Sequence, residues 1–268
     1  MAMLITGAAS GIGRHLVGAF LRRGERVAAS DLSLERLRDV AAADGWHGAG
    51  PPDALHMASL DVRDPGAWET VWAAAEAALG PVDRVLNVAG YLAPDWIEHA
   101  RDEDIERHFD VNTKGVVYGT RCAARHMIPR RAGHIINIGS LASLSPVPGL
   151  SLYAGSKFAV RGFTLSVALE LADKGVAVTV VLPDAVQTPM LDLQKPRAEA
   201  ALTFSGGRVL TPADIEATLV EVLRTRPLEV AIPAARGALA RFASVMPALG
   251  QHLLPLMRAL GRRRQTKT

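Results

Sequence analysis

The sequence predicts an α/β fold, a doubly wound parallel sheet of the Rossmann-like kind. Three observations carry this prediction. Short apolar stretches alternate with helix-length stretches through most of the chain. The first such stretch leads into a glycine-rich turn and then a helix. Residues 176–182 are apolar except for the β-branched Thr179, as strands of a sheet covered on both faces nearly are.

The elements follow from the same alternation. The predicted strands are residues 3–6, 26–30, 55–60, 82–86, 133–139, 176–182 and 229–232. The predicted helices are residues 12–23, 34–43, 65–79, 97–109, 111–127, 152–174 and 212–226. Pro65 stands where a helix accepts proline, and Gly24 and Gly175 stand where helices end.

Length and composition favour one large core. The chain has 268 residues, of which 49% are hydrophobic. We expect residues 1–233 to form a single domain with a small substrate lobe at 184–211. Residues 234–268 are expected to form an amphipathic helical tail with a basic end. We expect neither a leader peptide nor a membrane span.

Cysteine and charge narrow the function classes. The single Cys122 excludes an internal disulfide and suits the reducing cytoplasm, and its apolar surroundings indicate a structural residue. The net charge is +3, but residues 262–264 and Lys267 carry four positive charges at the C-terminal end. Removing these four from +3 leaves −1, so nucleic acid is not an expected partner.

The glycine-rich turn predicts a dinucleotide site. Gly7 permits a tight exit from the strand, Gly11 leaves room for a pyrophosphate, and Gly13 lets the helix pack on the sheet. The free N–H groups at the start of that helix would then face the phosphates. Asp31, at the end of the second strand, has the spacing of a carboxylate that binds the adenosine ribose.

The same aspartate predicts the cofactor. Asp31 can accept hydrogen bonds from two ribose hydroxyls but would repel a 2′-phosphate. The neighbouring positions are Ser10 and Leu32, and Arg14, the nearest basic residue, is expected to lie in solvent. NAD(H) is therefore favoured over NADP(H). Asp61, after the third strand, could reach the adenine amino group.

Tyr153 and Lys157 are four residues apart and therefore share one helix face. In isolation such a pair is more often an ordinary surface pair. A phenol that works near neutrality needs its pKa lowered by about three units, roughly 4 kcal/mol. One ammonium at about 4 Å, at an effective dielectric of about 20, supplies about that much. Lys157 is thus sufficient in principle, and a positive nicotinamide ring would add to its effect.

Several segments together resemble the short-chain dehydrogenase/reductase family in its compact single-domain form. They are residues 6–13, residues 87–90, Asn112, Ser140 and residues 153–157, and the resemblance extends over residues 3–232. It implies that Tyr153 is the general acid/base and that Lys157 lowers its pKa and binds the nicotinamide ribose. It also implies that Ser140 binds the substrate oxygen and that Asn112 holds a water in a proton relay through Lys157.

The resemblance also implies a set of cofactor contacts, with Thr188 placed against the nicotinamide amide. The set is Gly7, Ser10, Gly11, Ile12, Gly13, Asp31, Asp61, Val62, Asn87, Ala89, Gly90, Tyr153, Lys157, Pro183, Val186 and Thr188. No metal is expected. The chain departs from the family pattern at Val88, where an asparagine is common, and at Asp184, where glycine is usual. We expect Asp184 to cap a turn.

The substrate lobe is predicted to be apolar. Its predicted members are Leu141, Leu144, Val147, Leu150, Met190, Leu191, Leu193 and Phe204. These favour a hydrophobic secondary alcohol or its ketone as substrate. The alternative is a non-catalytic NAD(H)-binding regulator, against which the complete set of family residues counts.

Two predictions concern partners. Residues 111–127 and 152–174 contain small residues that permit close packing, and the family resemblance implies a homodimer or homotetramer through them. The tail has apolar residues at near-helical spacing, interrupted by Pro247 and Pro255: Leu239, Phe242, Val245, Met246, Leu249, Leu253, Leu256, Met257 and Leu260. With its basic end it could lie on an anionic membrane. It could instead cover the active site or make a subunit contact.

Overall fold

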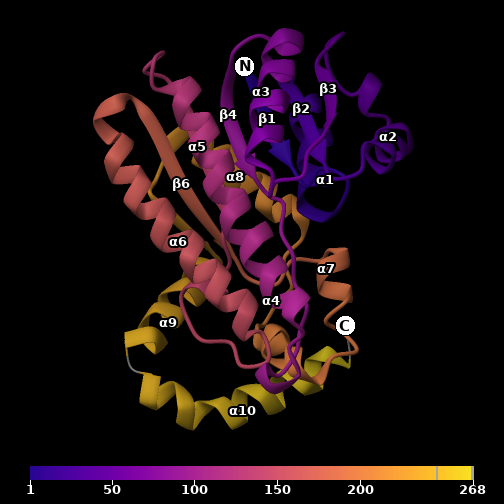
Figure 1. Ribbon diagram of the computed structural model, residues 1–268. Coiled ribbons are helices and arrows are strands. Elements are labelled where there is room, and N and C mark those ends of the chain that lie inside the picture. The colour runs from indigo at the N-terminus through magenta and orange to yellow at the C-terminus, as the bar shows by residue number, and fades with distance from the viewer. Residues whose placement is uncertain (246, 267–268) are drawn as a thin grey trace.

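One parallel sheet organises the molecule (Figure 1). The computed structural model describes residues 1–245 and 247–266. The seven strands lie in the order β3-β2-β1-β4-β5-β6-β7, and all neighbouring pairs are parallel. Their bounds are β1 Ala2–Thr6, β2 Arg26–Asp31, β3 Leu55–Ser59, β4 Val82–Asn87, β5 Gly133–Ile138, β6 Val176–Pro183 and β7 Glu229–Ile232. The strand order reverses between β1 and β4, which confirms the predicted doubly wound sheet.

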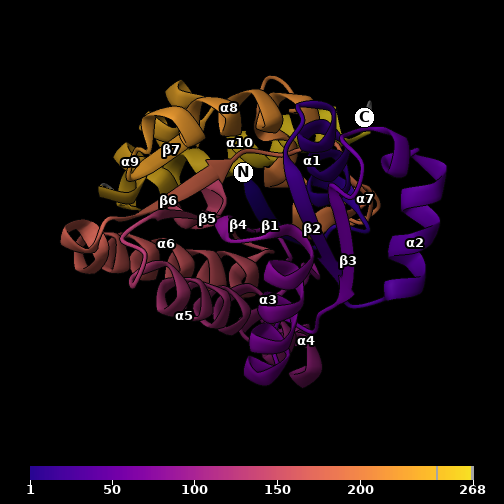
Figure 2. The same ribbon diagram turned by 90° about the horizontal axis from the view of Figure 1, so that it is seen from above.

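Helices cover both faces of this sheet (Figure 2). Those described are α1 Gly11–Arg22, α2 Leu34–Ala43, α3 Pro65–Leu79, α4 Asp102–Phe109, α5 Gly115–Met127, α6 Ser151–Leu171, α7 Pro189–Asp192, α8 Pro212–Thr225, α9 Ala234–Val245 and α10 Pro247–Gln265. Helices α3, α5 and α6 pack on one face, and α1 and α8 pack on the other.

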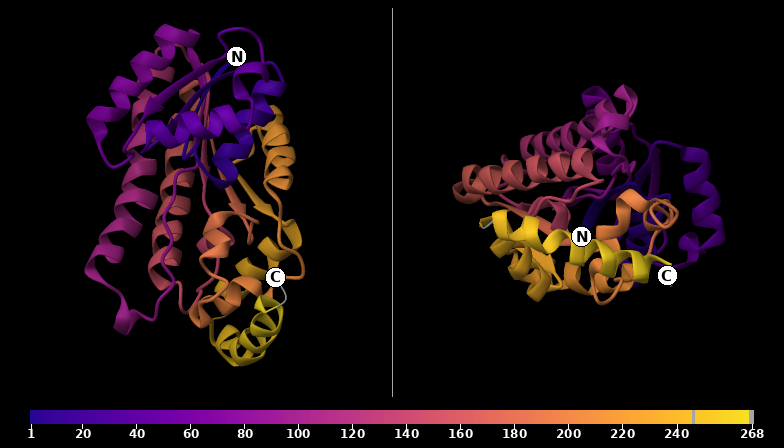
Figure 3. Two further views of the ribbon diagram at one scale, coloured as in Figure 1. Left: turned by 90° about the vertical axis from the view of Figure 1, so that its right-hand side faces the viewer. Right: turned by 90° about the horizontal axis from the view of Figure 1, so that it is seen from below.

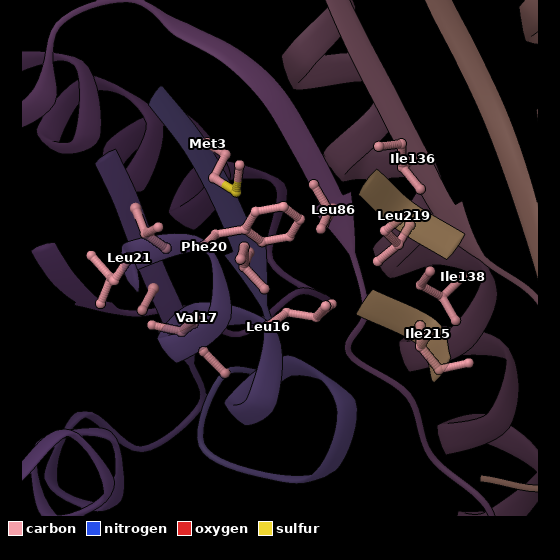
Figure 4. Packing of buried hydrophobic residues seen from close by; sticks show 14 of the residues in the cluster. Met3, Leu16, Val17, Phe20, Leu21, Leu86, Ile136, Ile138, Ile215 and Leu219 are labelled. Atoms are coloured by element: carbon pink, nitrogen blue, oxygen red, sulfur yellow. The ribbon is translucent and has the colours of Figure 1, made fainter. Parts of the chain in front are cut away.

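Each face has its own hydrophobic core. In β1, Met3 and Ile5 belong to the core under α1 and α8, whereas Ala2 and Leu4 belong to the core under α3 and α5. Successive side chains of a strand point to opposite faces, so a strand covered on both sides is apolar at every position. Figure 4 shows the first of these cores, in which side chains of α1 and α8 meet those of the strands.

The structure corrects the predicted helix at 97–109. Ile97–His99 form a single 3₁₀ turn, and α4 begins only at Asp102. The first turn of α4 carries Asp102, Glu103 and Asp104, three acids that the positive end of the helix stabilises. The helix therefore starts where its acids are, and not at the first apolar residue.

The predicted helix at 111–127 also differs. A π-helical turn, Asp110–Lys114, joins α4 to α5, and Asn112 lies inside it. Single π turns within α-helices occur frequently at functional sites, because the extra residue changes the direction of one side chain.

The lobe and the tail both contain helices. The lobe contains α7 and the 3₁₀ stretch Ala198–Ser205. In the tail Pro247 begins α10, but Pro255 lies inside it and does not interrupt it. Of the predicted tail residues, Met246 and Lys267 and the side chains of Leu249 and Leu253 lie outside the described part. None of the helices among the described residues is long and apolar enough to cross a bilayer.

We predict that Gly13→Ala destabilises the fold. A Cβ at this position would lie 2.2 Å from the carbonyl oxygen of Gly7, a backbone atom that cannot move aside cheaply. Overpacking of this kind costs roughly 1–3 kcal/mol, which urea unfolding would measure. Gly66→Ala, in the exposed first turn of α3, is the control and should change stability by less than about 0.5 kcal/mol. Equal effects of the two substitutions would contradict the prediction.

Candidate active site

A cavity of ≈ 560 Å³ opens at the C-terminal edge of the sheet. It brings together segments that follow six strands, together with residues of α9 and α10. The predicted site residues that line it are Gly7, Ser10, Gly11, Ile12, Gly13, Asp31, Asp61, Val62, Ala89, Gly90, Ser140, Tyr153, Lys157, Pro183, Val186 and Thr188. Asn87 and Asn112 do not line it.

The glycine turn shapes one end of this cavity. Gly7 has φ +67°, and a Cβ there would lie 2.9 Å from the Cα of Ala89. Gly11 has φ +52° and faces the Thr188 side chain. Helix α1 begins at Gly11 with no acid in its first turn, and the Ser10 side chain does not cap it. Its first N–H groups therefore remain available to an anion, which fits a pyrophosphate.

Asp31 is held at the wall of the cavity. One of its carboxylate oxygens accepts the N–H of Ala9 at 2.9 Å, which ties the end of β2 to the glycine turn. The Arg14 side chain remains partly exposed to solvent, as predicted, and its guanidinium pairs with Asp44 at 2.5 Å. The nearest basic residue of the turn is thus engaged by another carboxylate.

Asp61 has a partner that sequence reasoning missed. Arg63 also lines the cavity, and its guanidinium donates to both carboxylate oxygens of Asp61, at 2.9 and 2.7 Å. These hydrogen bonds hold the pKa of Asp61 below its usual value. Any contact of Asp61 with adenine therefore competes with this ion pair.

Asn87 lies behind the cavity wall, not at its surface. It is 2% exposed, and its amide donates to Asn137 at 2.8 Å. The loop that does reach the cavity is held by Thr6, whose hydroxyl accepts the N–H groups of Val88 and Ala89. Asn87 thus supports the wall from beneath, and its direct contact with the cofactor stays a prediction.

Tyr153 and Lys157 lie in the first turns of α6, inside the cavity. The Nζ of Lys157 donates to the Ile138 carbonyl at 2.9 Å and lies 5.7 Å from the centroid of the Tyr153 ring. Burial lowers the pKa of Lys157 to about 8. Desolvation raises the pKa of Tyr153 to about 12, although a hydrogen bond with Ser140 opposes this rise.

Burial of the phenol acts against the expected lowering of the Tyr153 pKa by Lys157, which stays a prediction. The cavity removes water from the phenol, and this desolvation disfavours the phenolate. The ammonium is bonded to a carbonyl oxygen, not to the phenol. Within the protein alone, burial therefore acts against the phenolate, and a neighbouring positive charge would oppose this effect.

Asn112 acts as a clamp between segments. Fully buried in the π turn, it accepts the N–H of Tyr91 at 2.6 Å and donates to the Tyr91 carbonyl at 2.9 Å. It also donates to the Ser156 hydroxyl, next to Lys157 in the chain, at 3.0 Å. It thereby fixes the loop after β4 against α6. The water that the family resemblance implies here stays a prediction.

The other end of the cavity is apolar. Its apolar lining includes Leu92, Leu141, Val147, Leu150, Met190, Leu191 and Leu202, with Leu239, Ala240, Ala243 and Met257 from the tail. Three predicted lobe residues do not line it. Leu144 and Phe204 are buried elsewhere, and Leu193 is exposed. The tail therefore forms part of the cavity wall.

Asp184 does not serve merely to cap a turn, as we expected. Its carboxylate pairs with Arg236 of α9 at 2.7 Å, and both residues line the cavity. Its N–H donates to the Ile232 carbonyl at the end of β7. The departure from the family pattern at this position thus anchors the tail beside the site. Spacing in the sequence carries no signal for such a distant pair.

We predict a pH-dependent effect of Lys157→Met on stability. The folded pKa of about 8 lies below the ordinary lysine value of 10.5, so between these values the unfolded wild type binds more protons than the folded protein. Wild-type stability therefore rises with pH in this window, and the buried ammonium is destabilising below it. The stability difference, variant minus wild type, should fall by about 2 kcal/mol from pH 7 to pH 9.5. Urea unfolding at both pH values measures this, and a constant difference would exclude it.

The comparisons with known proteins agree with this geometry. Residues 1–199 match the family model described as short chain dehydrogenase. The 2,3-dihydro-2,3-dihydroxybenzoate dehydrogenase of Bacillus subtilis is 36% identical over 189 residues, 69% of this chain and 70% of that protein. The NADP-dependent 3-hydroxy acid dehydrogenase YdfG of Escherichia coli is 34% identical over 219 residues, 80% of this chain and 86% of that protein.

Solved structures give the same result. The closed form of serine dehydrogenase complexed with NADP⁺ has a TM-score of 0.74 at 32% identity, covering 86% of this chain and 94% of its own. A short-chain dehydrogenase/reductase from Burkholderia phymatum in complex with NAD has a TM-score of 0.81 at 25% identity, covering 93% and 94%. The chain therefore belongs to the short-chain dehydrogenase/reductase family and is an oxidoreductase that acts on CH–OH groups.

Proposed function

We propose that this protein interconverts a neutral, hydrophobic secondary alcohol and its ketone, with NAD(H) as cofactor and Tyr153 as general acid/base. One observation carries the proposal. Ser140, Tyr153 and Lys157 line the same cavity as the glycine turn and the apolar side chains. A reacting carbon there would have an anion-binding turn on one side and an apolar wall on the other.

The chain's own residues have separate tasks in this mechanism. The start of α1, Asp31 and Thr188 would hold the cofactor. When bound, it would accept hydride from the alcohol carbon and place a positive ring near the phenol. The Ser140 hydroxyl orients the substrate oxygen, and Tyr153 takes the proton from that oxygen in oxidation and returns it in reduction. The ammonium of Lys157 reduces the cost of the phenolate.

Charge supports NAD(H). The Asp31 carboxylate stands at the wall of the cavity where the ribose would lie, next to the apolar Leu32. The pairing of Arg14 with Asp44 leaves that arginine engaged elsewhere. A 2′-phosphate would therefore meet a negative charge there, and no free Arg14 would compensate for it.

Charge and lining also support a neutral, apolar substrate. The walls near Tyr153 are mostly aliphatic, with Leu150 and Met190 packed in one cluster with the Tyr153 ring. Arg236, the cation that α9 places against the cavity, is already neutralised by Asp184. A substrate carboxylate would have to break that pair to bind there.

We expect Tyr153→Phe to remove activity without removing cofactor binding. The phenol is the proton-transfer group, so kcat for NAD⁺ reduction should fall at least 10²-fold, while the Kd for NADH changes only a few-fold. The assay follows NADH formation with 2-alkanols of increasing chain length, each beside its ω-carboxylate. Rates that rise with the chain length of the 2-alkanol, and that are lower for each ω-carboxylate than for its parent alcohol, support a neutral apolar substrate.

The matched control is Tyr118→Phe, which removes a phenol hydroxyl on α5 outside the cavity. Full activity of Tyr153→Phe would refute the catalytic assignment. Tight NADH binding by the wild type with no turnover of any substrate would favour the non-catalytic regulator instead.

Asp31→Ala should weaken the preference for NAD⁺. The substitution removes the hydrogen bonds that the carboxylate would accept from NAD⁺, and it removes the repulsion of the NADP⁺ phosphate. The ratio of kcat/KM for NAD⁺ to that for NADP⁺ should therefore fall by about 10- to 100-fold, or about 1.5–3 kcal/mol. Asp39→Ala, an exposed aspartate of α2 outside the cavity, is the control. An unchanged ratio in Asp31→Ala would argue against NAD(H) selection by this residue.

We propose a homodimer or homotetramer through α5 and α6, which is supported by the exposure of Phe158 and Leu169 on α6. We propose a cytoplasmic location, which suits the reduced, buried Cys122. We also retain residues 1–233 as the catalytic domain and residues 234–268 as its tail.

A further inference from the structure

The outer face of α9 and α10 is apolar. These helices form one border of the molecule, at the bottom of Figure 1 and nearest the viewer in the right-hand view of Figure 3. Five large apolar side chains are exposed on them: Leu239, Phe242, Val245, Leu256 and Leu260. Val245 is 81% exposed and Leu256 is 68% exposed. Spacings of three and four residues place them in a stripe along each helix.

The tail itself carries acidic or basic charge of one sign only. No aspartate or glutamate follows Glu229 in the sequence, whereas seven basic residues do. Some of these serve internal contacts, such as Arg241 with Glu229 and Arg258 over the Trp96 ring. Arg262 and Arg263 are exposed beside Leu260, and no carboxylate of the described residues pairs with them. The apolar stripe therefore ends in a cationic patch, Arg262 and Arg263, that no carboxylate among the described residues neutralises.

The inner face of the same helices belongs to the substrate cavity. Ala240 and Ala243 of α9 and Met257 of α10 line it. Leu239 lines the cavity as well, yet 58% of its surface is exposed, so it lies at the rim. The apolar outer stripe is thus continuous with the apolar wall of the cavity.

Polar contacts hold the tail in this position at both ends. At its start Arg236 pairs with Asp184. At its end the Gln265 amide donates to the carbonyls of Gln194, Lys195 and Arg197, at 3.0, 3.1 and 2.8 Å. The outer stripe is therefore presented by a fixed element. Because none of the described helices can cross a bilayer, a lipid contact here is peripheral.

We propose that the outer face of α9 and α10 docks on an anionic lipid surface, and that the substrate enters the cavity from that lipid past Leu239. The stripe would lie at the boundary between headgroups and acyl chains, and the arginines would contact lipid phosphates. The docking itself stands on the apolar and cationic face. The entry route rests on the proposed function, because it requires a hydrophobic substrate.

The test uses the full-length protein and two kinds of vesicle. One is phosphatidylcholine alone, and the other contains one third phosphatidylglycerol. We expect co-sedimentation with the anionic vesicles that weakens as salt rises. The combined substitution Phe242→Gln, Val245→Gln and Leu256→Gln should lower this affinity at least about tenfold. The matched control is Ile97→Gln with Leu228→Gln, two exposed apolar residues outside the tail.

A second pair of variants tests the charge. Arg262→Gln with Arg263→Gln should weaken binding to the anionic vesicles by about 5-fold for each arginine. Arg36→Gln with Arg38→Gln, on the exposed side of α2, should have little effect. None of the substituted tail residues lines the cavity, so turnover of a short, water-soluble alcohol should remain at the wild-type rate and confirm that each variant is folded.

Three results would overturn the docking proposal. The first is no binding of the wild type to anionic vesicles, and the second is equal binding by the wild type and both tail variants. The third is a smaller oligomer in the triple variant, because the face would then be a subunit contact. The proposed function fails separately. Binding to vesicles without turnover of any alcohol would refute only the proposed function. Turnover of soluble alcohols without binding to vesicles would refute only the docking.

Discussion

The close packing of α1 on the turn after β1 is the contact on which the rest of the site depends. At Gly13 the helix touches the carbonyl of Gly7, so there is no space for a side chain between them. This contact directs the free N–H groups of α1 along the sheet edge where the other strands end. The Asp31 carboxylate also stabilises this turn, because it accepts a hydrogen bond from the Ala9 N–H. The anion-binding end of the cavity is therefore a consequence of backbone packing.

The two groups proposed for proton transfer lie where their charged forms are disfavoured. Burial disfavours the charged forms of both Lys157 and Tyr153. The fold holds them nevertheless, because α6 is fixed through Ser156 to the π turn, where Asn112 also holds the loop after β4. Sites of this kind have a cost in stability that the surrounding cores offset. A positive charge beside the phenol, such as a bound nicotinamide ring would bring, would favour the phenolate.

The tail adds a layer that the common fold does not require. Asp184 and Arg236 join the end of β6 to the start of α9, and Gln265 joins the end of α10 to the lobe. One face of the tail thereby closes the cavity, and the other remains apolar and basic. The predicted alternatives of active-site cover and membrane contact are thus compatible, because they use opposite faces of the same helices.

Local sequence patterns are enough to predict the parallel sheet, the order of most elements and the glycine-turn and helix residues that line the cavity. These depend on local patterns: continuous apolar strands, glycines at fixed spacing, and polar residues just after strands that must meet at one edge. Tertiary structure alone decided the contacts between distant segments. Arg63 and Asp61, which pair, are only two residues apart in the sequence. In contrast, no periodic pattern in the sequence indicates the pairing of Asp184 with Arg236 or the burial of Asn87. The raised pKa of Tyr153 likewise depends on desolvation by all the residues around the phenol. The spacing of residues along one helix does not indicate this burial.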